Sequence, residues 1–413
     1  MAGRIVVVGG GFAGLWAAAA AARTRDALGR DDIITLVAPG RSHIVRVRCY
    51  EADLAPLRVP YDDVLGPIGV EHVEATVAAV DPAGRRVVLQ PDPVGATPVA
   101  LGYDRLILAA GSALRRPDVP GADSALDVDT LAGAQRLAAH LERLARATAG
   151  SRHAGRWQAV VVGGGLVGLE IACELPARLA RARDQAGDAG PVGTTLVDPA
   201  AQAGAAMGAA GPAIRQALAA AGVSYRGGSG VAAIDAAGVT LSDGTRLPVL
   251  TVVLATGLRA SPLAGTLGVP LDPLGRLPVD AFLRVEGMPE VFAAGDVAAA
   301  RADAAGHATV MSCQHARPMG RIAGHNAVCD LAGCPQDGLP FAAPDYVTVL
   351  DLGPWGAAYT AGWEREHLVS VGAAAKAVKR TINGSRIYPP AGRDRTAILA
   401  AAAPVIQAPP APS

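Results

Sequence analysis

A glycine-rich turn near the start of the chain has the spacing that binds the pyrophosphate of a dinucleotide. The turn contains Gly9, Gly11 and Gly14, and it follows four apolar residues at positions 5–8. The first glycine permits the sharp bend, the second lets the backbone approach the pyrophosphate, and the third lets a helix pack on the strand. Because the turn lies between a predicted buried strand and an Ala-rich helix at Leu15–Ala22, its context supports binding of an anion at the helix N-terminus.

A second turn with the same spacing, formed by Gly163, Gly165 and Gly168, predicts a second dinucleotide site. The next predicted strand ends at Asp198, whose carboxylate would accept hydrogen bonds from ribose hydroxyls and repel a 2′-phosphate. No Arg or Lys follows until Arg215, so the pattern favours NADH over NADPH. The alternative interpretation of Asp198 is an ordinary turn residue at the end of a strand.

The first unit lacks the acidic residue that the second unit carries. Its second strand ends at Ala38, so a carboxylate contact to the ribose is missing there. Arg41 or His43 could take over part of the binding of an adenosine, and we predict Arg41 as a cofactor contact.

Three further predicted strands end in small residues, where the backbone can approach a ligand closely. The small residues that we assign to cofactor binding at these strand ends are Ala110, Gly111, Thr256, Gly257 and Gly295, with Asp296 directly after.

The length of 413 residues predicts two or three domains. The repeated strand–turn–helix units predict an α/β fold with two Rossmann-like dinucleotide-binding domains and a small C-terminal α+β region. The predicted boundaries are 1–118 and 276–340 for the two parts of the first domain, 119–275 for the second domain, and 341–413 for the C-terminal region. The tail from Ala402 onward is rich in Ala and Pro and is expected to be flexible.

The charge balance and the cysteines exclude several classes of protein. Lys+Arg and Asp+Glu both number 37, so no charge excess indicates binding to nucleic acid. No apolar run reaches the roughly 18 residues of a membrane span, and no signal peptide is visible, so we expect a cytoplasmic protein. The five cysteines do not indicate a disulfide framework, although Cys329 and Cys334 have a C-x4-C spacing. No metal site is predicted.

The motifs occur in one order that is typical of a known family. The order is the first glycine turn, the strand ending at Gly111, the second glycine turn followed by Glu170, the strand ending at Gly257, and the strand ending at Asp296. The chain resembles the two-dinucleotide-binding-domain flavoproteins, the pyridine nucleotide-disulfide oxidoreductases, over roughly residues 4–390. Within them it is most similar to the type II NADH dehydrogenases, which are NADH:quinone oxidoreductases.

The resemblance implies a function and roles for individual residues. The first glycine turn, with Phe12 and Ala13, would hold FAD, and Asp296 would bond its ribitol. The second turn would hold NADH, which would pass hydride to FAD, and the electrons would continue to a quinone or quinone-like acceptor. Glu170 would lie near the nicotinamide–flavin junction, and its alternative role is a helix N-terminal carboxylate. Gln314 and His315 are candidates for the acceptor side, although a histidine here is often an ordinary helix residue.

The chain also departs from the family pattern. Only Cys49 lies early in the first domain, so a dithiol beside the flavin is unavailable. A helix expected from Thr309 to Leu331 would place Cys329 about 30 Å from the flavin, at 1.5 Å per residue, which favours structural thiols. The A-Q-x-x-x-Q quinone signature keeps Gln314 but has Val310 at its first glutamine.

Two other functions stay open at this stage. One is a soluble reductase for a specialised-metabolite intermediate or a carrier protein, and the other is a flavin-holding sensor or scaffold. Amphipathic C-terminal helices are not evident, so we expect at most peripheral membrane contact. The sequence leaves open whether the chain forms a homodimer.

Overall fold

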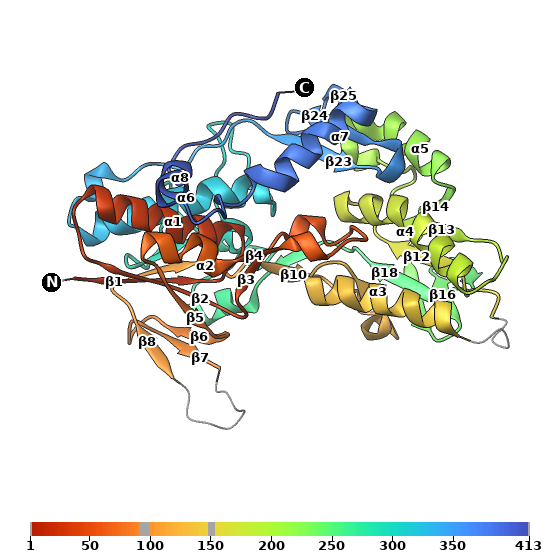
Figure 1. Ribbon diagram of the computed structural model, residues 1–413, viewed down its shortest axis with the longest axis horizontal. Coiled ribbons are helices and arrows are strands. Elements are labelled where there is room, and N and C mark those ends of the chain that lie inside the picture. Colours follow the sequence, from red (N-terminus) through yellow and green to blue (C-terminus); the bar gives the residue numbers. More distant parts are fainter. Residues whose placement is uncertain (1, 91–98, 148–152, 412–413) are drawn as a thin grey trace.

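The computed structural model describes residues 2–90, 99–147 and 153–411. Two five-stranded parallel sheets form two lobes at opposite ends of the long axis (Figure 1). Their central strands are apolar runs that are buried on both faces, as parallel strands covered by helices require. The predicted α/β fold with two Rossmann-like units is therefore confirmed.

The first sheet carries the first glycine turn. Its strands, in spatial order, are β21 (Val291–Ala293), β9 (Arg105–Leu108), β1 (Arg4–Val8), β2 (Ile33–Ala38) and β5 (Glu71–Glu74). Two helices, α1 (Phe12–Ala27) and α6 (Cys313–Leu331), pack against each other on this sheet (Figure 1). They approach closely because Gly320 and Gly324 face the backbone of α1, where a Cβ atom would lie 2.2 Å from a carbonyl oxygen.

The second sheet carries the second glycine turn. Its strands, in spatial order, are β11 (Leu126–Asp127), β18 (Thr251–Leu254), β12 (Gln158–Val162), β13 (Gly193–Asp198) and β14 (Val223–Gly227). The helices of this lobe are α3 (Leu131–Arg146), α4 (Leu166–Gln185) and α5 (Gly211–Ala220).

A short antiparallel pair joins the two lobes. Strand β10 (Ser112–Leu114) leaves the first lobe and pairs with β19 (Leu258–Ala260), on which the chain returns. Leu263 and Leu267 already pack in the core of the first lobe. The predicted domain boundary between residues 275 and 276 is therefore too late, because the chain re-enters the first lobe soon after β19.

Short strands and one short helix complete the two lobes. They are β3 (Ser42–Ile44) with β4 (Arg58–Pro60), β6 (Val77–Asp81) with β7 (Arg86–Leu89) and β8 (Ala100–Gly102), β15 (Val231–Asp235) with β16 (Gly238–Leu241) and β17 (Arg246–Leu247), β20 (Leu277–Pro278) with β22 (Ala298–Ala299), and helix α2 (Tyr61–Val64).

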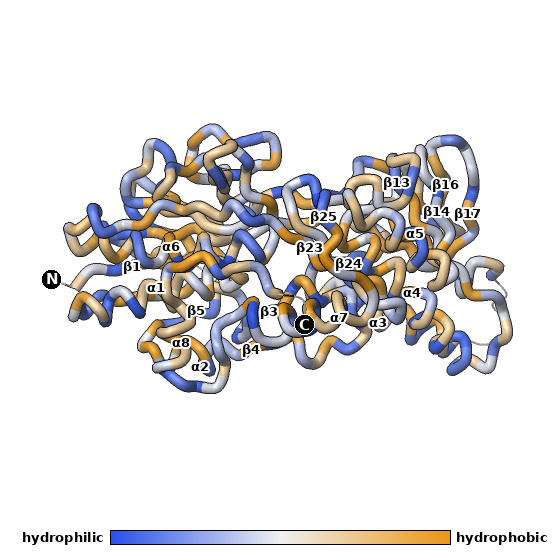
Figure 2. The backbone as a smooth tube through the Cα atoms, turned by 90° about the horizontal axis from the view of Figure 1, so that it is seen from above, coloured by the Kyte–Doolittle hydropathy of each residue, from blue (hydrophilic) through white to orange (hydrophobic). Residues whose placement is uncertain are grey.

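The C-terminal region contains the three predicted strands and lies between the two lobes (Figure 2). These strands, β23 (Val347–Asp351), β24 (Ala357–Ala361) and β25 (His367–Val371), form an antiparallel sheet covered by α7 (Gly372–Thr381). The last helix, α8 (Arg395–Ala401), packs on α1.

The tail after α8 differs from the flexible segment that its composition predicts. Side chains of the first lobe and of the C-terminal region bond its carbonyl groups as far as Pro410. These long-range contacts hold an extended segment that has no regular hydrogen bonding of its own.

Candidate active site

The two glycine turns have the geometry that a pyrophosphate requires. A Cβ atom on Gly14 would lie 1.7 Å from the Gly9 oxygen, so only glycine lets α1 pack on β1. Gly9 itself has a φ of 106°, which favours glycine. By contrast, an added Cβ on Gly11 would meet no atom within 4 Å. The turn therefore leaves open space where a bound pyrophosphate would approach the backbone, and the first unit fits FAD.

The second turn repeats this geometry. A Cβ atom on Gly168 would lie 1.8 Å from the Gly163 oxygen, whereas one on Gly165 would meet nothing within 4 Å. The Asp198 carboxylate braces the turn, because it accepts hydrogen bonds from the backbone N–H groups of Gly164 (2.5 Å) and Ala200 (2.8 Å). The unit fits NADH, and Asp198 lies at the end of β13 as predicted.

A cavity of about 640 Å³, called the central cavity below, joins the first glycine turn to the C-terminal region. It collects most of the residues that the sequence singles out for the first cofactor and for the reaction. Those that line it are Gly9, Gly11, Phe12, Ala13, Ala110, Gly111, Glu170, Gly295, Asp296 and Gln314. The second glycine turn, Asp198, Thr256 and Gly257 lie outside this cavity on the other lobe.

Asp296 lies on the wall of the central cavity in a polar network. The Ser112 hydroxyl donates a 2.6 Å hydrogen bond to its carboxylate, and Arg46 lies 3.8 Å away. Arg46 also pairs with Asp129, on the segment that crosses between the lobes. Burial raises the pKa of Asp296 above its ordinary value, although the Ser112 hydrogen bond opposes this shift. The sequence indicated no role for Ser112 or Asp129.

A buried ion pair faces the same cavity. Lys379 Nζ on α7 lies 2.8 Å from Glu170 Oε1 on α4, and the backbone N–H of Asp351 also donates to this oxygen (3.3 Å). Burial raises the pKa of Glu170, while the neighbouring Lys379 ammonium lowers it. Burial acts to lower the pKa of Lys379, but the Glu170 carboxylate outweighs it together with other nearby groups and the pKa is raised. Glu170 is therefore one half of an ion pair across two domains, and its partner Lys379 was not predicted.

A second lysine on α7 pairs with a different carboxylate. Lys376, one turn earlier on α7, pairs with Asp351 and does not line the central cavity. The two lysines lie three residues apart on one helix, so the sequence alone could not decide which of them reaches Glu170.

The predicted acceptor-side pair on α6 is separated by the structure. The helix begins at Cys313 and not near Thr309, and Pro318 lies inside it. Gln314 lines the cavity and donates a 2.9 Å hydrogen bond to the Asp345 carbonyl.

The neighbouring His315 points away from the cavity. Its Nδ1 accepts a 3.0 Å hydrogen bond from the Val310 N–H, and its ring lies beside the stacked rings of Tyr346 and Trp363. Burial lowers the pKa of His315 to about 4, so the ring is neutral at pH 7. The prediction of His315 as an acceptor-side residue is wrong, because adjacent helix residues point about 100° apart. Val310 is not part of the cavity wall either.

The predicted adenosine contacts also lie outside the cavity wall. Arg41 has an exposed side chain that pairs with Glu74. His43 is buried and its Nδ1 donates to the Gly10 carbonyl (3.0 Å), while burial lowers the pKa of its ring to about 4. His43 therefore stabilises the first glycine turn through this hydrogen bond and does not line the cavity.

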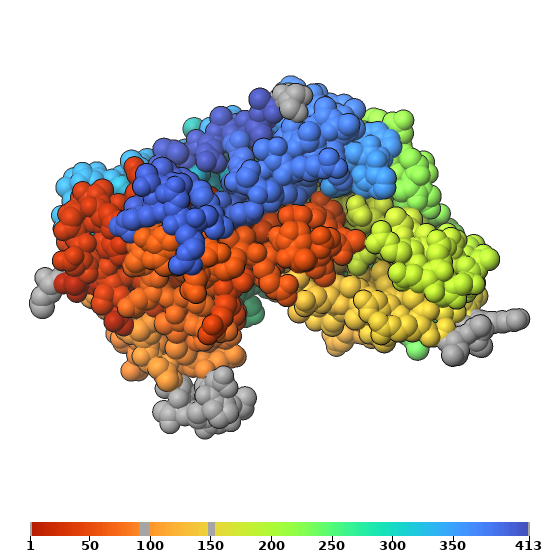
Figure 3. Space-filling model, in the orientation of Figure 1, coloured from red at the N-terminus to blue at the C-terminus, as the bar shows by residue number. Residues whose placement is uncertain are grey.

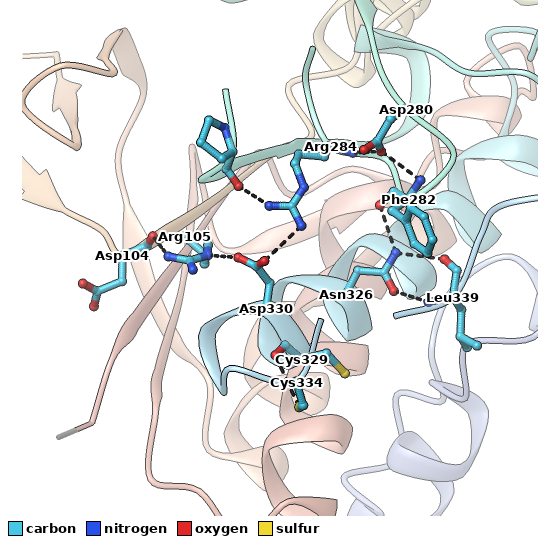
Figure 4. Close-up of polar contacts among 11 residues, drawn as sticks. Asp104, Arg105, Asp280, Phe282, Arg284, Asn326, Cys329, Asp330, Cys334 and Leu339 are labelled. Carbon is cyan, nitrogen blue, oxygen red and sulfur yellow. Dashed lines mark hydrogen bonds and ion pairs between the residues drawn. The ribbon is translucent and has the colours of Figure 1, made fainter. Parts of the chain in front are cut away.

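The cysteine pair Cys329 and Cys334 lies at the far end of α6. Figure 4 shows this end, where Arg105 and Arg284 both contact Asp330. Both thiols are free, and the Cys334 thiol donates to the Cys329 carbonyl (3.3 Å). At 1.5 Å per residue, Cys329 lies about 24 Å along the helix from Cys313, somewhat less than the 30 Å expected.

Replacing both Cys329 and Cys334 with serine is expected to leave turnover within about twofold of the wild type. Burial raises the pKa of the Cys329 thiol to about 12, so little reactive thiolate forms at pH 7. Steady-state oxidation of NADH with an added acceptor measures this. A folded double variant that binds flavin but has lost turnover would show that the pair relays electrons.

Metal ions and membrane spans receive no support from the described residues. Within residues 2–90, 99–147 and 153–411, no group of three or more metal-ligating side chains is placed to hold an ion. In the same part of the chain, no helix combines the length and the apolar character that a bilayer span requires.

Comparison with known proteins agrees with this geometry. The family model of the pyridine nucleotide-disulphide oxidoreductases matches residues 3–320. An NADH dehydrogenase-like protein of Mycobacterium tuberculosis is 51% identical over 410 residues, which cover 98% of this chain and 99% of the relative. A demethylphylloquinone reductase of Synechocystis is 30% identical over 371 residues, covering 86% of this chain and 85% of the relative.

The fold is also found among solved structures. The structure of NDH2 from Plasmodium falciparum in complex with NADH superimposes with a TM-score of 0.79 at 11% identity, and the match covers 97% of each chain. The family uses FAD and NADH, which agrees with the two open glycine turns. The chain therefore belongs to the pyridine nucleotide-disulphide oxidoreductases and is an NADH dehydrogenase-like, FAD-dependent enzyme.

Proposed function

We propose that the enzyme passes electrons from NADH, through FAD, to a quinone or a quinone-like small molecule. The observation that carries this proposal is the central cavity, which runs from the first glycine turn to an end lined by Gln314 and Lys379. An amide and an ammonium group are both donors that suit the carbonyl oxygens of a quinone. The Synechocystis relative is a demethylphylloquinone reductase, which supports the same acceptor class.

The residues of this chain have separate tasks in the proposed reaction. When bound, FAD supplies the redox chemistry, while the protein contributes binding, orientation and electrostatics. The open turn at Gly11 binds the pyrophosphate, and Asp296 holds the ribitol. Lys379 keeps a proton at the cavity wall, where Glu170 stabilises the ammonium form. Gln314 and Lys379 orient the acceptor.

An acceptor screen on the purified, FAD-loaded protein tests this function. We expect steady oxidation of NADH to require an acceptor, and a water-soluble quinone without a long isoprenoid tail should serve as that acceptor. If a carrier protein or another small molecule supports turnover and no quinone does so at any concentration, the quinone proposal is rejected. The enzyme would then be a reductase for a specialised acceptor. A protein whose bound flavin is reduced once by NADH, and which does not turn over with any acceptor, would fit a flavin-holding sensor or scaffold.

NADH is expected to be preferred over NADPH. Replacing Asp198 with asparagine keeps an oxygen that can accept from the Gly164 N–H but removes the charge that repels a 2′-phosphate. We expect this variant to narrow the ratio of kcat/KM values for the two nucleotides by about tenfold, which corresponds to roughly 1.4 kcal/mol. Asp198→Ala should also narrow the ratio and weaken NADH binding further, because the turn loses its brace. Equal kcat/KM values in the wild type would contradict the assignment.

Three further expectations stay predictions. They are a cytoplasmic location, at most peripheral contact with a membrane, and a homodimer as a possible assembly. Fractionation of cells and the molar mass of the purified protein in solution would test them.

A further inference from the structure

The segment Pro404–Ala411, called the strap below, forms part of the wall of the central cavity. Residues 406–410 of this segment line the cavity, and its outer surface at Val405–Ala408 is exposed. Figure 3 shows the segment as a strip on the molecular surface, between α8 and the C-terminal sheet. At this place a single extended chain therefore separates the cavity from solvent.

The strap is held by side chains and not by its own backbone. Among the described residues, no backbone–backbone hydrogen bond involves residues 406–411. Pro404, Pro409 and Pro410 favour an extended conformation and cannot donate from their backbone nitrogen atoms. A segment without internal hydrogen bonds can detach as one unit once its side-chain anchors are released.

Four anchors from outside the strap hold it in place. Arg321 donates to the Val405 carbonyl (3.0 Å), and Arg317 donates to the Gln407 side-chain oxygen (3.3 Å). The last two anchors, which bond the carbonyls of Ala408 and Pro410, are Arg386 and the Tyr359 hydroxyl, the latter at 2.8 Å.

Two of these anchors are buried cations without a carboxylate partner. Arg317 is 7% exposed and Arg321 is 0% exposed, and within the described residues neither lies in a salt bridge. The Nε atom of each also lacks a hydrogen-bond partner. Because a buried charge is costly when it is unpaired, the strap oxygen atoms supply solvation that these guanidinium groups need. The Arg386 carbonyl (2.6 Å from Arg317) and the Ala401 carbonyl (3.4 Å from Arg321) supply the rest of this solvation, so release of the strap removes part of it and the closed position is favoured.

We propose that the strap is a gate that closes the acceptor end of the central cavity and restricts the enzyme to small, water-borne quinone-like acceptors. This inference rests on the proposed function. With the strap closed, Ile406 to Pro410 occupy this part of the wall, so a long hydrophobic tail cannot leave the cavity on the side of the strap. Once the strap is displaced, long-tailed acceptors can bind.

The first test compares a short-chain quinone with a quinone that carries a long isoprenoid tail presented in detergent micelles. A variant that ends at Ala403 lacks the strap, and we expect its ratio of kcat/KM for the long-tailed over the short-chain acceptor to rise at least about tenfold. Tyr359→Phe removes one anchor, which should raise the ratio about two- to tenfold. The matched control is Tyr388→Phe, whose hydroxyl bonds the Gly384 carbonyl outside the strap and whose ratio should stay that of the wild type.

The second test needs no acceptor. Cys313 lines the central cavity and its thiol is free, so its rate of alkylation reports on access to the cavity. In FAD-loaded protein, the ratio of labelling by a bulky maleimide to labelling by iodoacetamide, read at Cys313 by mass spectrometry, should rise at least fivefold in both strap variants. It should not rise in Tyr388→Phe.

The two tests separate the inference from the function on which it rests. If no quinone is reduced but the Cys313 labelling ratio rises, the strap is a gate and the proposed acceptor is wrong. If short-chain quinones are reduced while both ratios stay unchanged in flavin-bound strap variants, the strap is not a gate. A variant without the strap that fails to fold leaves Tyr359→Phe to decide, and an unchanged labelling ratio in that variant overturns the inference.

Discussion

Replacing Gly11 with valine is expected to give a folded protein that no longer binds flavin. A Cβ atom on Gly11 meets no protein atom within 4 Å, so the side chain can be accommodated in the absence of cofactor. The same space is where the pyrophosphate must approach the backbone, so the affinity for FAD should fall by about two orders of magnitude or more. The absorbance of the purified protein, FAD titration and a thermal melt of the cofactor-free form measure these effects.

The chain supplies matched controls for this substitution. Gly165→Val places the same side chain in the second turn, which is equally open, so this variant should keep its flavin and lose affinity for NADH. Gly14→Ala should instead lower stability, because its Cβ atom would lie 1.7 Å from the Gly9 oxygen. A Gly11→Val protein that purifies with a full complement of FAD would contradict the assignment of the first turn.

Replacing Lys379 with methionine is expected to destabilise the protein by about 3–5 kcal/mol, because it leaves the Glu170 carboxylate buried without its cation. Turnover with the acceptor should also fall, since the proposed donor at the cavity wall is lost. The double variant Glu170→Gln with Lys379→Met removes both charges, and we expect it to recover most of the lost stability. Denaturant unfolding of the wild type and of these two variants measures the free energies of unfolding.

The pH dependence of the stability of the Lys379→Met variant follows from the direction in which the pKa of Glu170 is shifted. Burial raises the pKa of Glu170 in the wild type, and loss of the ammonium group should raise it further. The folded state then binds more protons than the unfolded state, so stability is highest below the unfolded pKa of about 4.3 and is lost as the pH rises through the folded value. The wild type should show the same sign with a smaller amplitude. A variant with unchanged stability and an unchanged pH slope would show that the pair is not coupled.

The sequence predicted those parts of the site that depend on local geometry. Both glycine turns and the strand ends at Gly111 and Asp296 are found as expected, because the conformation of such a turn is set by residues close in sequence. The repeated strand–turn–helix pattern also predicted that the fold contains two dinucleotide-binding units, each built on a parallel sheet.

The sequence could not predict features that depend on contacts between distant segments. Lys379 pairs with Glu170 across more than two hundred residues, and no local pattern distinguishes it from Lys376. Gln314 and His315 were both candidates for the acceptor side, but only the packing around the helix shows which of the two side chains reaches the cavity. The strap has the composition of a flexible tail, yet arginines on α6 hold it in place. In each case the deciding interaction is tertiary.

Rapid mixing of the NADH-reduced, FAD-loaded enzyme with a short-chain quinone under anaerobic conditions tests the proposed function most directly. We predict that the flavin absorbance returns at a rate that increases with quinone concentration, and that one quinone is reduced for each NADH consumed. A flavin that NADH bleaches but that no quinone reoxidises, at any concentration, would contradict the proposal that a quinone-like molecule accepts the electrons.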